Sequence, residues 1–190
     1  MQDFASLLPL LITVTGAVLI MLYAVCPQAK QQTASYICAA FFGAAFVVGL
    51  LTFGSEGELF SGIFKGVIGV SAFSNAASII IFGCGFFTVA ACSTYFREHK
   101  FATVEFYSLL LFSACGMVLL SMARELITAF IALEIMSLAI YILVGFDRNS
   151  PRATEAVFKY LLLGAFAGAF FCMGTAMIFG ATGSTRFAVI

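Results

Sequence analysis

The amino-acid sequence predicts an all-α polytopic membrane protein with about six transmembrane helices. Of its 190 residues, 63% are apolar and only 9% are charged, whereas a soluble domain carries about 25% charged residues. A water-exposed surface cannot be built at this charge content, so a soluble enzyme is excluded. Six spans of about 20 residues need about 120 apolar positions, and this composition supplies them.

The apolar runs give the order of the spans within a single membrane domain of residues 1–190. Their length and lack of alternation predict helices and exclude the strands of a barrel. Four runs are free of charge and two contain one charge each, Glu134 and Lys159. Pro9 is expected to kink the first span. The predicted spans are residues 4–26, 35–53, 73–96, 106–123, 126–146 and 156–179.

Residues 54–72 form the longest connection between spans. Five glycines interrupt its short apolar runs, so it cannot cross a membrane. We expect it to form an interfacial strand pair or helix at the extracytoplasmic ends of the spans.

The basic residues predict which side of the membrane each connection faces. The connections after the first, third and fifth spans carry five Lys and Arg residues, against three on the opposite side. The positive-inside rule therefore places those connections in the cytoplasm and the N-terminus outside it. All six tyrosines lie near the predicted cytoplasmic ends, so the two membrane faces differ consistently. The basic residues are Lys30, Arg97, Lys100, Arg148 and Arg152 on one side, and Lys65, Arg124 and Arg186 on the other.

Several kinds of chemistry are excluded by what the sequence contains. The formal net charge of zero gives no field that would recruit nucleic acid. The six cysteines lie in or at the ends of apolar runs without a C-x-x-C pair, which indicates core residues and no disulfide framework. His99 is the one histidine and is expected in a solvated loop, so no metal site is predicted. Without dinucleotide, phosphate-loop or nucleophile motifs, neither redox chemistry nor hydrolysis is expected in this chain.

Glu134 is the first candidate functional residue, because it lies near the middle of its predicted helix. A charge there costs at least about 2.5 kcal/mol, so the carboxyl must be neutral, paired with a cation or hydrated. Ser137 and Tyr141 follow at i+3 and i+7, which forms a polar stripe toward the cytoplasmic end. The stripe predicts either a file of water leading to a proton-handling carboxyl or hydrogen bonds between helices.

Lys159 is the second candidate, about 10 Å inside the predicted cytoplasmic boundary. Its long side chain could extend outward to water. Glu155 precedes it by four residues, the spacing of a helical ion pair. Structural pairing with Glu155 and functional coupling to Glu134 both remain open from these residues alone. Gly164 and Gly168 in the same span permit close helix contact.

Four segments between Glu105 and Thr185 resemble a known family. They read EFYSLLLFSACGM, LEIMSLAIYILVGF, EAVFKYLLLGAFAGAF and GATGST. They are similar to subunit N of the proton-translocating NADH:quinone oxidoreductase, respiratory complex I. This family is homologous to mitochondrial NADH dehydrogenase subunit 2 and belongs to the antiporter-like membrane subunits.

The resemblance implies roles for the two intramembrane charges. Glu134 corresponds to the key glutamate of the family's fifth helix, and Lys159 to the lysine of the sixth. In the family such residues form a charged axis that couples quinone reduction to proton transfer. NADH, FMN, iron-sulfur clusters and quinone are then expected in other subunits, with none bound here. The implied partners are the lipid bilayer and other membrane subunits of complex I, and the implied location is the bacterial inner membrane.

The resemblance also implies that much of the family's fold lies outside this sequence. Family members have about fourteen helices in two inverted repeats, and the chain matches only their N-terminal part. It is therefore expected to be a truncated or split product, with a second chain supplying the remaining helices. The alternatives are a non-conducting structural subunit, or a subunit of a related cation/proton antiporter.

Overall fold

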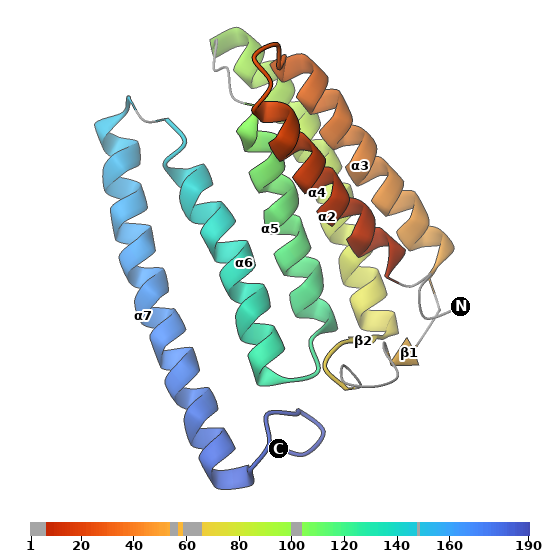
Figure 1. The fold of residues 1–190 in the computed structure, drawn as a ribbon, viewed down its shortest axis with the longest axis vertical. Coiled ribbons are helices and arrows are strands. Elements are labelled where there is room, and N and C mark those ends of the chain that lie inside the picture. The colour runs from red at the N-terminus through yellow and green to blue at the C-terminus, as the bar shows by residue number, and fades with distance from the viewer. Residues whose placement is uncertain (1–6, 54–56, 59–65, 100–103, 148) are drawn as a thin grey trace.

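The computed structural model describes residues 7–53, 57–58, 66–99, 104–147 and 149–190. These residues form six helices that run up and down the long axis of the molecule (Figure 1). Five of the helices are long and apolar enough to cross a membrane, and α2 is a shorter apolar helix of 17 residues. The all-α polytopic fold class is thus confirmed. The helices are α2 (Leu8–Ala24), α3 (Gln31–Leu51), α4 (Ala72–His99), α5 (Glu105–Met122), α6 (Leu126–Val144) and α7 (Pro151–Thr182).

The connections alternate between the two ends of the bundle, as the sequence predicts. The C-terminal ends of α2, α4 and α6 and the N-terminal ends of α3, α5 and α7 lie at one end, which we call the basic end (Figure 1). Both described strands and the C-terminal segment lie at the other, the hairpin end. The helix bounds place all six tyrosines in the halves of the helices nearer the basic end.

α7 is longer than its predicted span because its ends are fixed by caps and not by apolar content. The Ser150 hydroxyl accepts a hydrogen bond from the Ala153 N–H at 3.4 Å, and Pro151 occupies the first turn. The other end stops at Gly183, whose φ of 71° is the left-handed conformation that closes many helices. The resulting helix has 32 residues.

Two local expectations were wrong. Pro9 lies in the first turn of α2, where no intrahelical N–H bond is required of it, so it does not kink that helix. His99 is the last residue of α4 and not part of a loop, because the helix continues past the apolar run through Arg97. Lys65, Lys100 and Arg148 lie outside the described residues.

The connection before α4 contains the expected strand pair. β1 (Gly57–Glu58) pairs antiparallel with β2 (Gly69–Val70). Next to it, the Arg124 N–H donates to the Val67 carbonyl at 2.9 Å, and the Leu126 N–H donates to the Thr185 carbonyl at 2.9 Å. The α5–α6 linker therefore joins the segments before α4 and after α7 by backbone bonds at the hairpin end.

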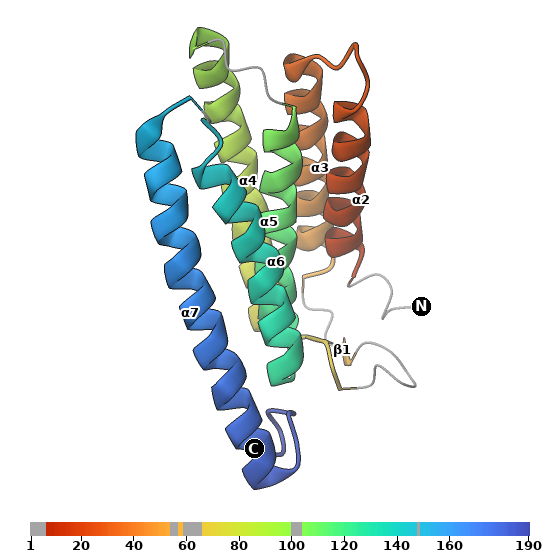
Figure 2. The ribbon, with the colours of Figure 1, turned by 60° about the vertical axis from the view of Figure 1, so that its left-hand side comes forward.

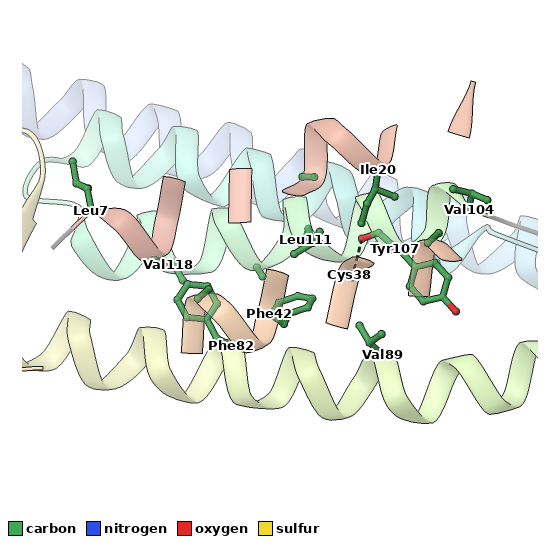
Figure 3. Close-up of a cluster of buried hydrophobic side chains, with 14 of the residues drawn as sticks. Leu7, Ile20, Cys38, Phe42, Phe82, Val89, Val104, Tyr107, Leu111 and Val118 are labelled. Atoms are coloured by element: carbon green, nitrogen blue, oxygen red, sulfur yellow. Dashed lines mark hydrogen bonds between the residues drawn. The ribbon is translucent and has the colours of Figure 1, made fainter. Parts of the chain in front are cut away.

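The packed core lies among α2, α3, α4 and α5. Its large, fully buried side chains include Ile20, Phe42, Phe82, Leu111 and Tyr107, several of which Figure 3 shows in one cluster. α6 adds only small buried apolar side chains such as Ala132, and α7 has no buried residue. Figure 2 shows α7 on the outside of the bundle beside α6. The fold is a packed group of four helices carrying a more open α6–α7 pair.

Glycines allow the closest approach between α5 and α6. A Cβ placed on Gly116 would lie 2.5 Å from the Met136 backbone nitrogen and 2.8 Å from its Cα. Since lipid tails are as apolar as the side chains, packing of this kind replaces the hydrophobic effect as the force between helices. The position of α6, and with it of Glu134, therefore depends on Gly116 having no side chain.

The Gly116→Ala variant is expected to be destabilised by about 1–3 kcal/mol, because the added methyl group must move the α6 backbone. Gly174→Ala is the matched control, since a Cβ there meets nothing within 4 Å. Thermal unfolding in detergent and the amount of folded protein in membranes measure the difference. Equal losses in the two variants would contradict this account of the α5–α6 contact.

Candidate functional site

The polar stripe predicted on α6 faces a cleft of about 330 Å³ between α6 and α7. Glu134, Ser137 and Tyr141 all line it, so the three residues share one face of α6 as their spacing predicts. On the opposite wall lie Gly164 and Gly168 of α7. The remaining lining residues are Phe130, Leu133, Tyr160, Leu163, Ala167 and Phe171.

Glu134 is an unpartnered carboxyl group at the middle of α6. Its side chain is half-buried, and no described residue gives it a hydrogen bond or an ion pair. A Cβ on Gly168 would lie 3.1 Å from Glu134 Oε1, so that glycine leaves room for the carboxyl. A polar group at this depth needs partners, and the cleft has space for several water molecules.

Aromatic pairs border the cleft on both sides of Glu134. Toward the basic end, the rings of Tyr141 and Tyr160 meet edge to face at 5.2 Å. Toward the hairpin end, Phe130 and Phe171 stack with their ring centroids 5.7 Å apart. The hydroxyl-bearing pair and the Ser137 hydroxyl make the basic side polar. The phenylalanine pair makes the other side apolar, so the cleft is chemically asymmetric.

Lys159 does not lie in this cleft. Its ammonium forms an ion pair with Glu155, and the two side chains are 72% and 64% exposed. Lys159 precedes Gly168 by nine residues, which at 100° per residue puts the two on opposite faces of α7. The structure thus pairs Lys159 with Glu155. Ser137 and Tyr141 lie on the same face of α6 as Glu134. Lys159 and Glu134 do not contact each other.

Two features of the site were missed in the sequence. Gly164 and Gly168 were interpreted as general packing residues, yet they face Tyr141 and Glu134 individually. Tyr160 was counted only among the tyrosines of the membrane interface, although it forms one wall of the cleft. Its position four residues before Gly164, one helical turn away, was the available signal. No group of three metal-ligating side chains occurs within the described ranges.

Comparison with known sequences shows which proteins this chain resembles. Residues 123–190 match the family described as NADH:quinone oxidoreductase/Mrp antiporter, TM. NADH-quinone oxidoreductase subunit N from Chloroflexus aggregans is 35% identical over 97% of this chain and 37% of its own length. Subunit N from Leptospira interrogans is 36% identical over 97% of this chain and 36% of its length. The chain therefore spans little more than a third of the relatives it matches.

Solved structures agree with the fold. Respiratory complex I from Thermus thermophilus with bound aureothin contains a chain that matches with a TM-score of 0.79 and 30% identity. That match covers 94% of this chain and 38% of the other. An archaeal membrane-bound sulfane sulfur reductase matches with a TM-score of 0.81 at 19% identity, which shows a shared fold only.

The helical bundle and these matches show an antiporter-like, multi-pass membrane fold. Its homologues are subunits of NADH-quinone oxidoreductase, an oxidoreductase complex. Within that class, the chain is similar to a part of subunit N, at about 35% identity over nearly all its residues.

The contact between Gly164 and Tyr141 can be tested by a double-mutant cycle. A Cβ on Gly164 would overlap the Tyr141 hydroxyl, so Gly164→Ala is expected to lower the free energy of unfolding by about 1–3 kcal/mol. Tyr141→Phe removes the overlapping oxygen and should recover part of that loss in the double variant. Thermal unfolding of the four proteins gives the coupling. Additive effects would show that the two residues do not meet.

Proposed function

We propose that the chain is a membrane-arm component of proton-translocating NADH:quinone oxidoreductase, in which Glu134 is a proton-loading site. The observation that carries this proposal is the Glu134 carboxyl, which faces a cleft in the middle of a membrane helix without a partner among the described residues. An ionisable group at this depth is a functional site by default. The relatives named subunit N support the assignment to this complex.

The proposed proton path runs from the basic end of the bundle to Glu134. Ser137 and Tyr141 line the cleft in that direction and can hold water by donating and accepting hydrogen bonds. Water next to the carboxyl stabilises its ionised form, and loss of that water favours the protonated form. The stacked Phe130 and Phe171 border the cleft on the other side, and the described residues that line this cleft include no polar side chain there. Glu134 would therefore exchange protons with the basic end.

Lys159 would act on Glu134 through space and not by contact. Two unit charges at about 4 Å interact by about 4 kcal/mol at an effective dielectric of about 20, and the energy falls in inverse proportion to their separation. An ammonium on the outer face of α7 can therefore tune the charge of Glu134 modestly while paired with Glu155. Movement of Lys159 toward or away from Glu155 would change that influence.

The remaining parts of the proposal concern the setting of the chain. The basic end would face the cytoplasm of a bacterium and the hairpin end the opposite side, across the inner membrane. Other membrane subunits of the complex would be its partners, since the matched structure is that of a multi-subunit complex. NADH, FMN, iron-sulfur clusters and quinone would be bound in other subunits. A second chain or further segment would supply the helices that the relatives have in addition.

The Glu134→Gln variant tests the proton-loading role. In the assembled complex it is expected to lower proton translocation coupled to quinone reduction at least about tenfold, because the amide cannot carry a proton. Glu105→Gln is the matched control, since Glu105 is exposed in the first turn of α5 and lies outside the cleft. Proton uptake by vesicles, measured beside NADH oxidation, reports the coupling. Normal pumping by an assembled Glu134→Gln complex would leave only a structural role for the chain.

A pair of variants separates structural pairing from coupling at Lys159. If the pair with Glu155 only supports α7, Lys159→Ala and Glu155→Gln should each cost about 0.3–0.5 kcal/mol of stability and leave pumping intact. If Lys159 tunes Glu134, Lys159→Ala should reduce proton translocation several-fold and Glu155→Gln should not reduce it equally. Vesicle proton uptake and thermal unfolding are measured for both variants. Identical effects on pumping would contradict the tuning role.

A further inference from the structure

A second cleft contains a buried hydroxyl group without a partner. Tyr107 in the first turn of α5 is fully buried, yet its hydroxyl oxygen forms no hydrogen bond with any described residue. Figure 3 shows the hydroxyl at one end of the apolar cluster, directed away from Leu111 and Phe42. It lines a cleft of about 290 Å³ between α3, α4 and α5. Since buried polar groups are almost always bonded, an occupant of this cleft is expected to bind it.

The other side chains of this cleft are uncharged hydrogen-bonding groups. Ser35 and Ser93 donate their hydroxyl protons to backbone carbonyls, and one Gln32 amide N–H donates to Tyr36. The Gln31 amide and the Thr94 hydroxyl line the same cleft as the Tyr107 hydroxyl, which has no hydrogen-bond partner among the described residues. None of the described lining residues carries a carboxylate, so an anion would meet donors there. The lining residues are Gln31, Gln32, Ser35, Tyr36, Ser93, Thr94 and Tyr107.

The start of α3 adds a favourable field for an anion. Its N-cap residue, Lys30, makes no side-chain capping bond, so the first N–H groups of the helix lack a side-chain acceptor. Gln31 and Gln32, the first two helical residues, line the cleft. A helix N-terminus carries partial positive charge, and here the first two helical residues line the same cleft as the unpartnered Tyr107 hydroxyl.

The cleft also lies at the depth of lipid headgroups. It is at the basic end, where tyrosines gather, and Tyr36 on its rim is 67% exposed. An apolar surface extends from it toward the membrane centre. Val47 lies on the same face of α3 as Tyr36 and is 53% exposed, and Phe87 lies on the same face of α4 as Thr94 and is 73% exposed. Acyl chains can contact these side chains.

We propose that this cleft binds the phosphate group of an anionic phospholipid. The phosphate would accept hydrogen bonds from Tyr107, Gln31 and the first N–H groups of α3, and the acyl chains would lie along the exposed faces of α3 and α4. The site is separate from the Glu134 cleft and does not depend on proton translocation. A specifically bound lipid would join α3, α4 and α5 at the basic end.

The test uses the purified native assembly after removal of lipid with detergent. Phosphatidylglycerol, phosphatidylcholine and inorganic phosphate are added separately, and binding is followed by native mass spectrometry and thermal unfolding. Phosphatidylglycerol is expected to bind and stabilise more than the other two. Tyr107→Phe should weaken its binding about tenfold, the value of one hydrogen bond to a charged group. Tyr95→Phe, an exposed tyrosine at the same end that does not line the cleft, should bind normally.

Three results would overturn the proposal. Unchanged lipid affinity in Tyr107→Phe would exclude the site, and equal stabilisation by inorganic phosphate would exclude a lipid as its source. A Tyr107→Phe protein that is more stable than the parent in lipid would show that the hydroxyl is simply unsatisfied. Gln31→Leu, at the partly exposed edge of the cleft, should weaken binding several-fold and gives the same answer if Tyr107→Phe fails to fold.

Discussion

The structure depends on the requirement that polar groups within hydrocarbon find partners. Most serine and threonine hydroxyls in the described helices meet it locally, by donating to a carbonyl one turn earlier, as Thr88 does to Cys84 and Thr175 does to Phe171. Ser108 meets it between helices by donating to the Ala17 carbonyl of α2. The Glu134 carboxyl and the Tyr107 hydroxyl are exceptions to this rule. Each lacks a partner among the described residues, and each faces a cleft that can admit one.

The two clefts lie at different kinds of helix contact. Tyr107 is held in the packed group of α2 to α5, where the rings of Phe96 and Phe106 contact it edge to face. Glu134 faces α7, which has no buried residue and contacts the bundle through α6. A cleft between loosely packed helices can change its water content with small helix movements, whereas one in a packed core cannot. This difference suits a switchable proton site at Glu134 and a fixed lipid site at Tyr107.

The sequence predicted the helices and the intramembrane charges, because both follow from local composition. It also predicted that Glu134, Ser137 and Tyr141 share one face, since the helical repeat determines it. The sequence could not predict that Gly164 meets Tyr141, because the rotation of α7 against α6 depends on both helices together. The separation of Lys159 from Gly168 follows from their nine-residue spacing, because this spacing puts them on opposite faces of a helix. The early start of α7 was likewise signalled by Ser150 and Pro151.

The asymmetry of the Glu134 cleft bears on how a proton site could work without leaking. A carboxyl connected by water to both membrane faces at once would let protons pass down their gradient and dissipate it. Ser137, Tyr141 and Tyr160 supply polar groups on one side of Glu134, and Phe130 and Phe171 supply only apolar rings on the other. An apolar barrier cannot order a chain of water, so a proton loaded under the proposed function would return to the basic end unless it left sideways. Lys159 and Glu155 lie exposed outside the cleft and contact each other, so they do not provide that sideways route by direct contact with Glu134.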